Sequence, residues 1–482
     1  MPSPGPSRAT DLLRWPLLGP LLRWRHVRAA AQIVLLAVAI VIVLHGLLGR
    51  QLAATNLATV LTWIHYRGLL IGALLLAGNL FCGACPMILV RDAARRFHRP
   101  SRRWPKRLGK WGALALFAAA LFAYELFDLW SLPAATAWIV LGYFGAALAV
   151  DLTFTGASFC KYVCPVGQFN FVASTLSPLE VRVRDRDVCR TCKTVDCIKG
   201  RRDERAPRVV TARGCELALF LPAKVGNLDC TFCLDCVHAC PHDNAAIGFR
   251  VPGEELADDR RRSAIGRLSR RPDLAALALL FAFAALINAL AMTAPASAVE
   301  RWLAAWLGTT REAPVLGLLF AAGLVAVPVA AVGAAAAATH ALAPGSGRGV
   351  ASIAVRFAFA LVPFGAGVWL AHYGFHFLTG VGAILPVAQV AAIDLAGQAL
   401  LGEPDWRWMG VRSGAVFPFQ LGAIVLGALG ASAVAHRIAE RDFPSRAVGA
   451  SAPWIVLVML LTALALWIVG LPMEMRGMGL GG

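Results

Sequence analysis

Long apolar stretches separated by short basic segments are the feature that most constrains how this chain folds. A helix needs about 20 apolar residues to cross a bilayer, and nine stretches meet that requirement: 29–49, 57–80, 111–130, 135–156, 273–293, 314–338, 353–373, 414–435 and 453–471. With 58% hydrophobic and only 15% charged residues, the chain has too little polar surface for a soluble protein of 482 residues. The sequence therefore predicts a mainly α-helical, polytopic membrane protein with about nine transmembrane helices.

One further apolar stretch, at 380–401, contains Pro386, Asp394 and Gln398 and could either span or lie at the surface. The strongly basic segments are 1–28, 91–110, 182–271 and 437–446. All of them fall on one side of the membrane only if 380–401 does not span. Because basic loops stay cytoplasmic, we expect 380–401 to be interfacial or re-entrant, with the N-terminus inside and the C-terminus outside.

The net charge of +18 raises the question of nucleic-acid binding. The positive charges, however, cluster between the apolar stretches, where they would face anionic lipid headgroups. We therefore expect contact with membrane lipid and no nucleic acid. No cleavable signal peptide is expected, since the first apolar run is long enough to span and lacks a convincing small-residue cleavage site.

Metal binding is indicated by the cysteines, because all twelve lie between Cys82 and Cys240, mostly in tight pairs on the predicted cytoplasmic side. The clearest run is Cys230, Cys233, Cys236 and Cys240, followed by Pro241. This is the C-x2-C-x2-C-x3-C-P spacing of bacterial [4Fe–4S] ferredoxins. Zinc is the alternative for paired cysteines, but four cysteines in this order before a proline favour iron–sulfur.

An altered partner motif lies upstream, at Cys189, Cys192 and Cys197, and Cys215 is the remaining cysteine of this region. In two-cluster ferredoxins the fourth cysteine of one motif ligates the other cluster. The crossed pattern predicts two [4Fe–4S] clusters with two ligand sets: Cys189, Cys192, Cys197 and Cys240, and Cys230, Cys233, Cys236 and Cys215. Cys215 stands alone in the sequence, outside any Cys-x2-Cys pair.

These motifs suggest three consecutive parts. Residues 1–165 form a four-helix membrane unit with Cys-Pro motifs at its cytoplasmic edge, and 166–271 form an inserted cytoplasmic ferredoxin-like α+β domain with two [4Fe–4S] clusters. Residues 272–482 form a C-terminal membrane unit of five helices, rich in small residues that let helices pack closely.

Two more cysteine pairs are expected at the membrane edge. Cys82 and Cys85 precede Pro86 at the end of the second predicted helix, and Cys160 and Cys164 precede Pro165 after the fourth. Both helices run toward the cytoplasm, so the pairs emerge at the same surface. They could hold a third cluster or another metal, or form a redox-active dithiol. The alternative is four buried cysteines at helix ends with no function.

Histidines are the polar membrane residues of most interest, because such residues are costly in lipid. His45, His65, His372 and His376 are all predicted near the outer ends of helices. They could ligate haem b or contact a quinone; hydrogen-bonded interfacial histidines are the alternative. At the C-terminus, Met473, Met475 and Met478 offer thioethers that suit Cu(I), although a short glycine-rich tail often carries methionines incidentally.

The combination of the Cys-Pro motifs with a downstream ferredoxin domain resembles the NapH/NosR/CcoG group of polytopic membrane ferredoxins. The block from Phe159 to Phe169, which contains Cys160 and Cys164, is particularly similar, and the resemblance covers about residues 30–250. It implies a protein of the bacterial inner (cytoplasmic) membrane that relays electrons between the quinone pool and a soluble or periplasmic redox protein in respiration. The sequence departs from the group in its five-helix C-terminal extension and in lacking a large periplasmic flavin-bearing domain before the first helix.

Two other functions remain open. A copper-reducing, metal-handling assembly factor of the CcoG kind would use the clusters as reductant and the histidines and terminal methionines as receivers. A membrane anchor would use its clusters only for stability. No nucleophile elbow, phosphate-binding glycine loop or nicotinamide fingerprint is present, so we expect an electron-transfer component and not a stand-alone enzyme.

Overall fold

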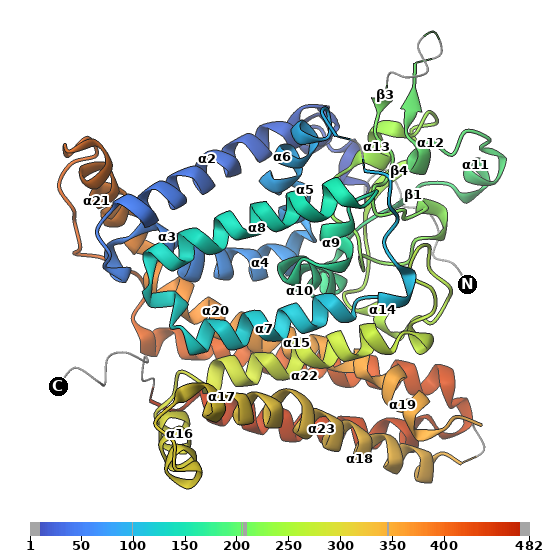
Figure 1. The fold of residues 1–482 in the computed structure, drawn as a ribbon. Helices are drawn as coiled ribbons and strands as arrows, with labels where there is room; N and C mark the ends of the chain where they lie inside the picture. The colour runs from blue at the N-terminus through green and yellow to red at the C-terminus, as the bar shows by residue number, and fades with distance from the viewer. Residues whose placement is uncertain (1–9, 99, 204, 206–209, 345–346, 473–482) are drawn as a thin grey trace. The chain divides into compact units, whose positions relative to one another are not determined.

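A computed structural model describes residues 10–472 apart from 99, 204, 206–209 and 345–346, and helices dominate it (Figure 1). The chain divides into two compact units. The cysteine unit comprises residues 1–38, 73–113 and 144–271, and the helical unit comprises residues 39–72, 114–143 and 272–482. The division into 1–165, 166–271 and 272–482 stays a prediction, since compactness alone does not test it.

The predicted fold class is confirmed. Eight helical segments of the described chain are long and apolar enough to cross a membrane: Val27–Leu48, Leu57–Ala77, Pro133–Thr153, Pro272–Leu290, Glu312–Leu342, Val350–Ala396, Ser413–Asp442 and Pro444–Val469. By helix length and hydropathy the chain is a multi-pass membrane protein. The stretch predicted at 111–130 forms a shorter apolar helix, α7 (Trp111–Leu126), of 16 residues.

The ambiguous stretch at 380–401 contains α21 (Ile384–Ala396), which follows α20 (Val362–Gly380) after one 3-10 turn. The 13 residues of α21 rise about 20 Å, whereas the hydrocarbon core is about 30 Å thick. This length agrees with an element that does not span by itself, although its position in the membrane stays a prediction.

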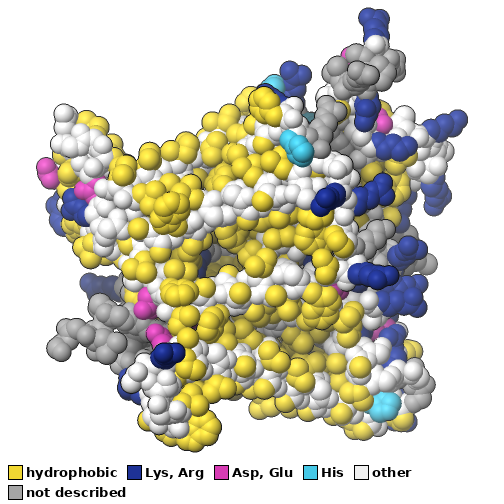
Figure 2. All heavy atoms as spheres, in the orientation of Figure 1, with side chains coloured by type: hydrophobic (Ala, Val, Ile, Leu, Met, Phe, Trp, Pro, Cys, Tyr) yellow, Lys and Arg dark blue, Asp and Glu magenta, His cyan; other side chains and the backbone are white. Residues whose placement is uncertain are grey.

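Apolar side chains face outward along the candidate spans, as lipid contact requires. On α2 (Val27–Leu48), for example, Val34 is 62% and Leu48 71% exposed. Figure 2 shows hydrophobic side chains along the helices, whereas Lys and Arg gather on the loops around α11 (Arg186–Thr191) and α12 (Asp196–Lys199).

The helical unit packs around α20. This helix contacts α15 (Pro272–Leu290) and α22 (Ser413–Asp442), and α22 also contacts α23 (Ala447–Val469). A Cβ at Gly367 would lie 2.5 Å from the Ala423 oxygen, so glycine is what lets α20 and α22 approach. The other α-helices of this unit are α3 (Leu57–Thr59), α16 (Ala294–Leu307), α17 (Glu312–Ala321), α18 (Val327–Leu342), α19 (Val350–Phe357) and α21.

Short helices and two small sheets make up the cysteine unit. Its helices are α1 (Leu18–Arg23), α5 (Leu80–Gly83), α6 (Pro86–Ala94), α9 (Ser158–Tyr162), α10 (Pro165–Ala173), α11, α12, α13 (Asp235–Ala239) and α14 (Glu254–Ala257). Four helices contribute residues to both units, namely α2, α4 (Arg67–Ala77), α7 and α8 (Pro133–Thr153).

The larger sheet joins the two ends of the ferredoxin-like segment. Strand β1 (Leu179–Val183) pairs antiparallel with β4 (Ala245–Phe249), with Val181 opposite Ile247 (Figure 1). The smaller sheet pairs β2 (Arg201–Arg202) with β3 (Val210–Ala212). Val181 and Ile247 enter a core that also takes in Phe232 and Leu234 from the cysteine loop. The sheet therefore supports the chain that carries Cys230, Cys233 and Cys236.

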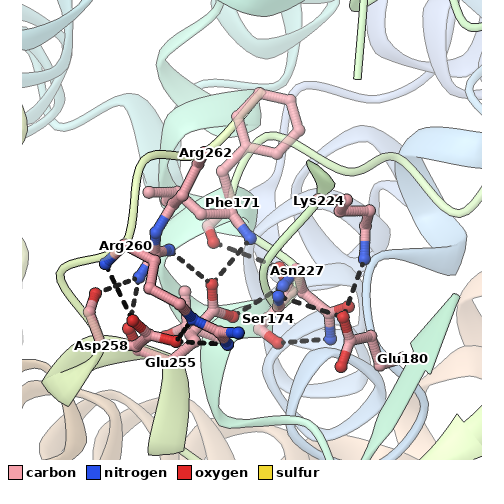
Figure 3. Close-up of polar contacts among 12 residues, drawn as sticks. Phe171, Ser174, Glu180, Lys224, Asn227, Glu255, Asp258, Arg260 and Arg262 are labelled. Carbon is pink, nitrogen blue, oxygen red and sulfur yellow. Dashed lines mark hydrogen bonds and ion pairs between the residues drawn. The ribbon is translucent and has the colours of Figure 1, made fainter. Parts of the chain in front are cut away.

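A buried carboxylate orders the chain just before Cys230 (Figure 3). Glu255 is paired with Arg250 and Arg262, both at 2.9 Å, and all three side chains are 1% exposed. Its Oε1 also accepts the backbone N–H of Asn227 at 2.6 Å, and the Asn227 side chain donates to the Leu179 oxygen at 2.7 Å. The buried charges thus fix the loop to β1.

Replacing Glu255 with alanine should destabilise the cysteine unit strongly. It would leave two buried guanidinium groups without their carboxylate, and breaking a buried pair typically costs about 3–5 kcal/mol. We expect a lower midpoint temperature for loss of iron–sulfur absorbance. Glu254→Ala, at an exposed neighbouring position, is the matched control and should behave as wild type; equal midpoints for the two variants would contradict this role.

Candidate metal centres

All twelve cysteines are free and half-buried, and all lie in the cysteine unit. The structure brings them together in three sets of four. We call them the pocket group (Cys189, Cys192, Cys197 and Cys240), the loop group (Cys215, Cys230, Cys233 and Cys236) and the edge group (Cys82, Cys85, Cys160 and Cys164).

The pocket group lines a single pocket, together with Val183, Phe220 and Asn244. Cys240 thus joins the cysteines of the upstream motif and not those of its own run. The Asn244 side chain donates to Cys189 Sγ at 3.2 Å, and the Asn244 backbone N–H donates to Cys240 Sγ at 3.3 Å. These four residues are the ligand set that the crossed pattern predicts. Asn244 was missed in the sequence, where nothing distinguishes a hydrogen-bonding asparagine from a turn residue.

The loop group forms around a strained stretch of backbone. Asp229, Phe232 and Leu234 all have positive φ, at 63°, 51° and 61°. Non-glycine residues rarely adopt this conformation, and it recurs where a loop wraps a ligand. Cys215 lies close enough to act electrostatically on Cys233 and Cys236, so the structure places it with this group.

Two proline-started helices carry the edge group. Cys85 and Cys164 each occupy the position before a helix whose first residue is proline, namely α6 and α10. Proline suits that position because its missing N–H would have no partner there. Cys164 Sγ accepts the Gly167 N–H at 3.1 Å, and Cys82 Sγ accepts from the Asn170 side chain at 3.2 Å.

The four edge cysteines come together from two distant parts of the sequence. Cys160 acts electrostatically with Cys164 and Cys85, and Cys164 also acts with Cys82. They lie just beyond the ends of two candidate spans, Leu57–Ala77 and Pro133–Thr153. The predicted convergence of the two Cys-Pro motifs is therefore present in the structure.

The three groups are linked by direct contacts. The Cys215 N–H donates to the Cys197 oxygen at 2.9 Å, which joins the loop group to the pocket group. The Asn79 side chain donates to the Cys230 oxygen at 3.2 Å, which joins the loop group to the edge group. At Gly83 an added Cβ would lie 2.9 Å from the Thr231 oxygen, so a side chain there would separate these loops.

Burial opposes ionisation of the thiols. It raises the pKa of the Cys197 thiol to about 11 and that of Cys82 to about 12, and it also raises the pKa of Cys233. Cys192 differs, because hydrogen bonds, first from the Val195 backbone N–H, lower the pKa of its thiol. The protein alone therefore favours neutral thiols at most of these positions, and a metal must supply the charge that holds them as thiolates.

The donor arrangement fits a multinuclear cluster better than a single ion. Within the described residues, no three His, Cys, Asp or Glu side chains gather closely enough to hold one metal ion. A cubane separates its thiolate ligands more widely than a zinc ion does, because each thiolate binds a different iron. Four converging cysteines that receive N–H···S hydrogen bonds fit such a cluster.

Comparison with known proteins agrees with these motifs. Over 190 residues the chain is 27% identical to the ferredoxin-type protein NapH of Escherichia coli (strain K12), and the match covers 36% of the chain and 64% of NapH. The chain is a distant homologue of NapH. It spans slightly less than two thirds of the length of NapH. The predicted resemblance to the NapH/NosR/CcoG group is confirmed. No family model matches the chain, and no solved structure matches it. The similarity to a ferredoxin-type protein and the cysteine motifs of this chain both point to iron–sulfur clusters.

Two buried cations lie beside the cysteines of this NapH-like protein, and neither was predicted. Arg91 is 1% exposed and pairs with Asp92 and Glu216, both at 2.7 Å, and with Asp151 at 3.4 Å. Its charge acts on Cys85 and Cys160. Each of these side chains looks unremarkable in the sequence, because its partners are far away along the chain.

Lys110 is the second cation. Its side chain pairs with Asp229, the residue before Cys230, and donates to the Gln168 side chain at 2.8 Å. Burial lowers the pKa of Lys110. Gln168 in turn donates to the Cys160 oxygen at 3.1 Å, so this lysine connects the backbone of the edge and loop groups.

The four predicted histidines divide into two kinds. His45 accepts the Leu57 N–H at 3.0 Å and contacts Asp394 at 3.2 Å, and His65 contacts the backbone oxygens of Val60 and Val381. Both are therefore engaged in local contacts. His372 and His376 lie together, with ring centroids 4.9 Å apart. Haem ligation by any of them stays a prediction.

Serine substitutions should sort the cysteines by cluster. If the crossed ligand sets are correct, Cys240→Ser should alter the same electron paramagnetic resonance signal as Cys189→Ser. Cys215→Ser should alter the same signal as Cys233→Ser. Each substitution should leave the other signal unchanged, because it removes a ligand from one cluster only. A shared effect of Cys240→Ser and Cys233→Ser would contradict the crossed assignment.

Proposed function

We propose that this chain relays electrons between the quinone pool and a redox protein in bacterial respiration, through three iron–sulfur clusters held by the pocket, loop and edge groups. The observation that carries the proposal is the series of hydrogen bonds between the chain segments that carry these groups, from Cys197 to Cys215 and from Cys230 to Asn79, three residues before Cys82. Homology to NapH, a ferredoxin-type protein, supports the same chemistry.

Oxidation of a quinol releases two electrons and two protons, and a bound [4Fe–4S] cluster would take up one electron at a time. The chain's own part is to hold the thiolates, shield them from water and donate hydrogen bonds to their sulfurs. Asn170 at Cys82 and Asn244 at Cys189 are such donors. Hydrogen bonds of this kind stabilise the more negative, reduced state and therefore tune the reduction potential.

The edge group supports the connection to a membrane substrate. It lies next to the ends of two candidate spans, whereas the pocket group lies on the sequence segment 189–240 between spans. We infer that electrons cross between the membrane phase and the edge group, and that the pocket group exchanges them with a soluble partner on its own side of the membrane. The partner itself is part of the proposal.

A cytoplasmic position for the cysteine unit is proposed from its charge. Four arginines line a pocket immediately before the span that begins at Pro272: Arg261, Arg267, Arg270 and Arg271. Juxtamembrane arginines of this kind attract the anionic headgroups of the cytoplasmic leaflet and retain their segment on that side. Membrane lipid is thus a proposed partner of this segment.

A copper-handling function of the CcoG kind stays a prediction without a structural observation to favour it. Its proposed receivers Met473, Met475 and Met478 lie outside the described residues.

Iron content should report the number of clusters. Anaerobically purified protein is expected to contain about twelve iron and twelve acid-labile sulfide per chain, and Cys82→Ser and Cys164→Ser should each lower both by about four. About eight iron in the wild type, unchanged in these variants, would contradict a cluster at the edge group. Zinc in place of iron would contradict all three.

Addition of a quinol tests the relay itself. Oxidised protein mixed with a short-chain ubiquinol under anaerobic conditions should lose cluster absorbance as the clusters are reduced. Cys164→Ser should slow this bleaching at least about tenfold, because the edge group is the proposed entry. Clusters that never change oxidation state with quinol or quinone would instead identify a structural anchor.

A further inference from the structure

The helical unit contains two imidazoles that each have one buried nitrogen, Nε2, without a hydrogen-bond partner among the described residues. They belong to His372 and His376, which lie one turn apart on α20. His372 is only 4% exposed. An unpartnered polar atom is especially costly inside a membrane span, and such residues usually meet a ligand or water.

Arg67 lies beside the two imidazoles and is enclosed by aromatic rings. Its guanidinium carbon is 4.4 Å from the ring centre of Trp63, 4.3 Å from that of Tyr124 and 5.1 Å from that of Tyr373. Its charge acts on both His372 and His376. The rings stabilise the cation by cation–π contact and present flat apolar faces around it.

The backbone around Arg67 lets this residue lie close to α20. Residues Val60–Tyr66, which include Trp63, form a π-helical turn directly before Arg67, and such turns recur at functional sites. At Gly68 an added Cβ would lie 2.3 Å from the Phe377 Cβ, so glycine brings Arg67 against α20. The Trp63 ring is fixed by a hydrogen bond from its Nε1 to Thr136 at 2.9 Å.

The charges around Arg67, His372 and His376 decide which class of ligand suits this site. The charge of Glu125 acts on Arg67, and its Oε1 accepts from the Asn288 side chain at 3.2 Å. Because a carboxylate lies within electrostatic range of Arg67, we infer that the site does not require a further anion. A metal cation is disfavoured by the guanidinium beside both imidazoles. The remaining class is a neutral ligand whose oxygens can accept from, or donate to, an imidazole.

His372 and His376 cannot be the two axial ligands of one haem. Both project from the same helix one turn apart, with their rings at 87° to one another. They therefore cannot approach one iron from opposite faces of a porphyrin.

We propose that Arg67, His372 and His376 bind the headgroup of a membrane quinone, whose oxygens complete the hydrogen bonding of the two Nε2 atoms. The choice of a quinone among neutral ligands rests on the proposed relay function, and the site itself rests on the geometry above. The helical unit is thereby assigned a substrate site that uses the C-terminal helices, which lie beyond the predicted resemblance at 30–250.

Photolabelling of the full chain in lipid nanodiscs tests the site directly. The probe is an azido derivative of a short-chain ubiquinone. We expect its label on the peptides that contain Val60–Tyr66 and α20, and we expect competition by unlabelled ubiquinone. Label confined to other helices, or label that ubiquinone does not displace, overturns the proposal.

Substitutions provide the second test. His376→Gln and the double variant His372→Gln/His376→Gln should each bind the unlabelled quinone at least about tenfold more weakly, as expected for lost hydrogen bonds in a buried site. His436→Gln is the control: its imidazole is 42% exposed and contacts Glu440, and binding should be unchanged. A thermal unfolding midpoint of the full chain equal to wild type confirms that each variant is folded; unchanged affinity in the double variant overturns the proposal.

Cluster reduction by quinol, measured in wild type and in the double variant, distinguishes failure of this site from failure of the relay. Quinol that reduces the clusters equally fast in wild type and double variant leaves the relay intact and overturns this site. A second outcome is that wild type is labelled at α20, the double variant is not, and quinol does not change the oxidation state of the clusters. That outcome supports the quinone site and overturns the relay.

Discussion

The close contact between the loop at Gly83 and the loop at Thr231 and Phe232 is the constraint on which the arrangement of the cysteines depends. A side chain at Gly83 would meet the Thr231 oxygen at 2.9 Å and the Phe232 oxygen at 3.1 Å. Backbone-to-backbone contact of this kind places the Cys82 and Cys230 segments next to each other without intervening side chains. Arg28 reinforces it, since it donates to the Gly83 oxygen at 3.1 Å and pairs with Asp235 at 2.7 Å.

In the cysteine unit, buried charged side chains fix the positions of the loops relative to one another. Glu255, Arg91 and Lys110 each bind backbone or side chains on segments that are distant in sequence. In its described residues the segment 166–271 contains short helices, two short two-stranded sheets and long loops, so regular backbone pairing orders little of the chain that carries the cysteines. Buried pairs of this type add little net stability but are costly to break, so they specify one arrangement of the cysteine loops.

The sequence predicted those features that depend on spacing along the chain. Apolar length identified the spanning stretches, and the pattern at Cys230–Cys240 predicted that Cys240 would join Cys189 and not Cys233. Partners such as Asn244, Arg91 and Arg67 were not predicted. Their importance arises from contacts across tens to hundreds of residues, which no local period encodes. The helix at 111–126 was predicted too long, because its apolar run continues past the end of the helix.

The histidines show why an unsatisfied group is more informative than a merely polar one. All four were singled out in the sequence for the same reason, their cost in lipid. His45 and His65 meet that cost with Asp394 and backbone oxygens. Arg262 and Asn227 also have a buried polar atom without a hydrogen-bond partner. Other atoms of the same two side chains are, however, hydrogen-bonded. His372 and His376 differ, because among the described residues the Nε2 atom of each is buried beside a cation without a hydrogen-bond partner. Two unpartnered imidazole nitrogens in a membrane helix are costly by themselves. They become favourable when a bound ligand supplies their hydrogen-bond partners.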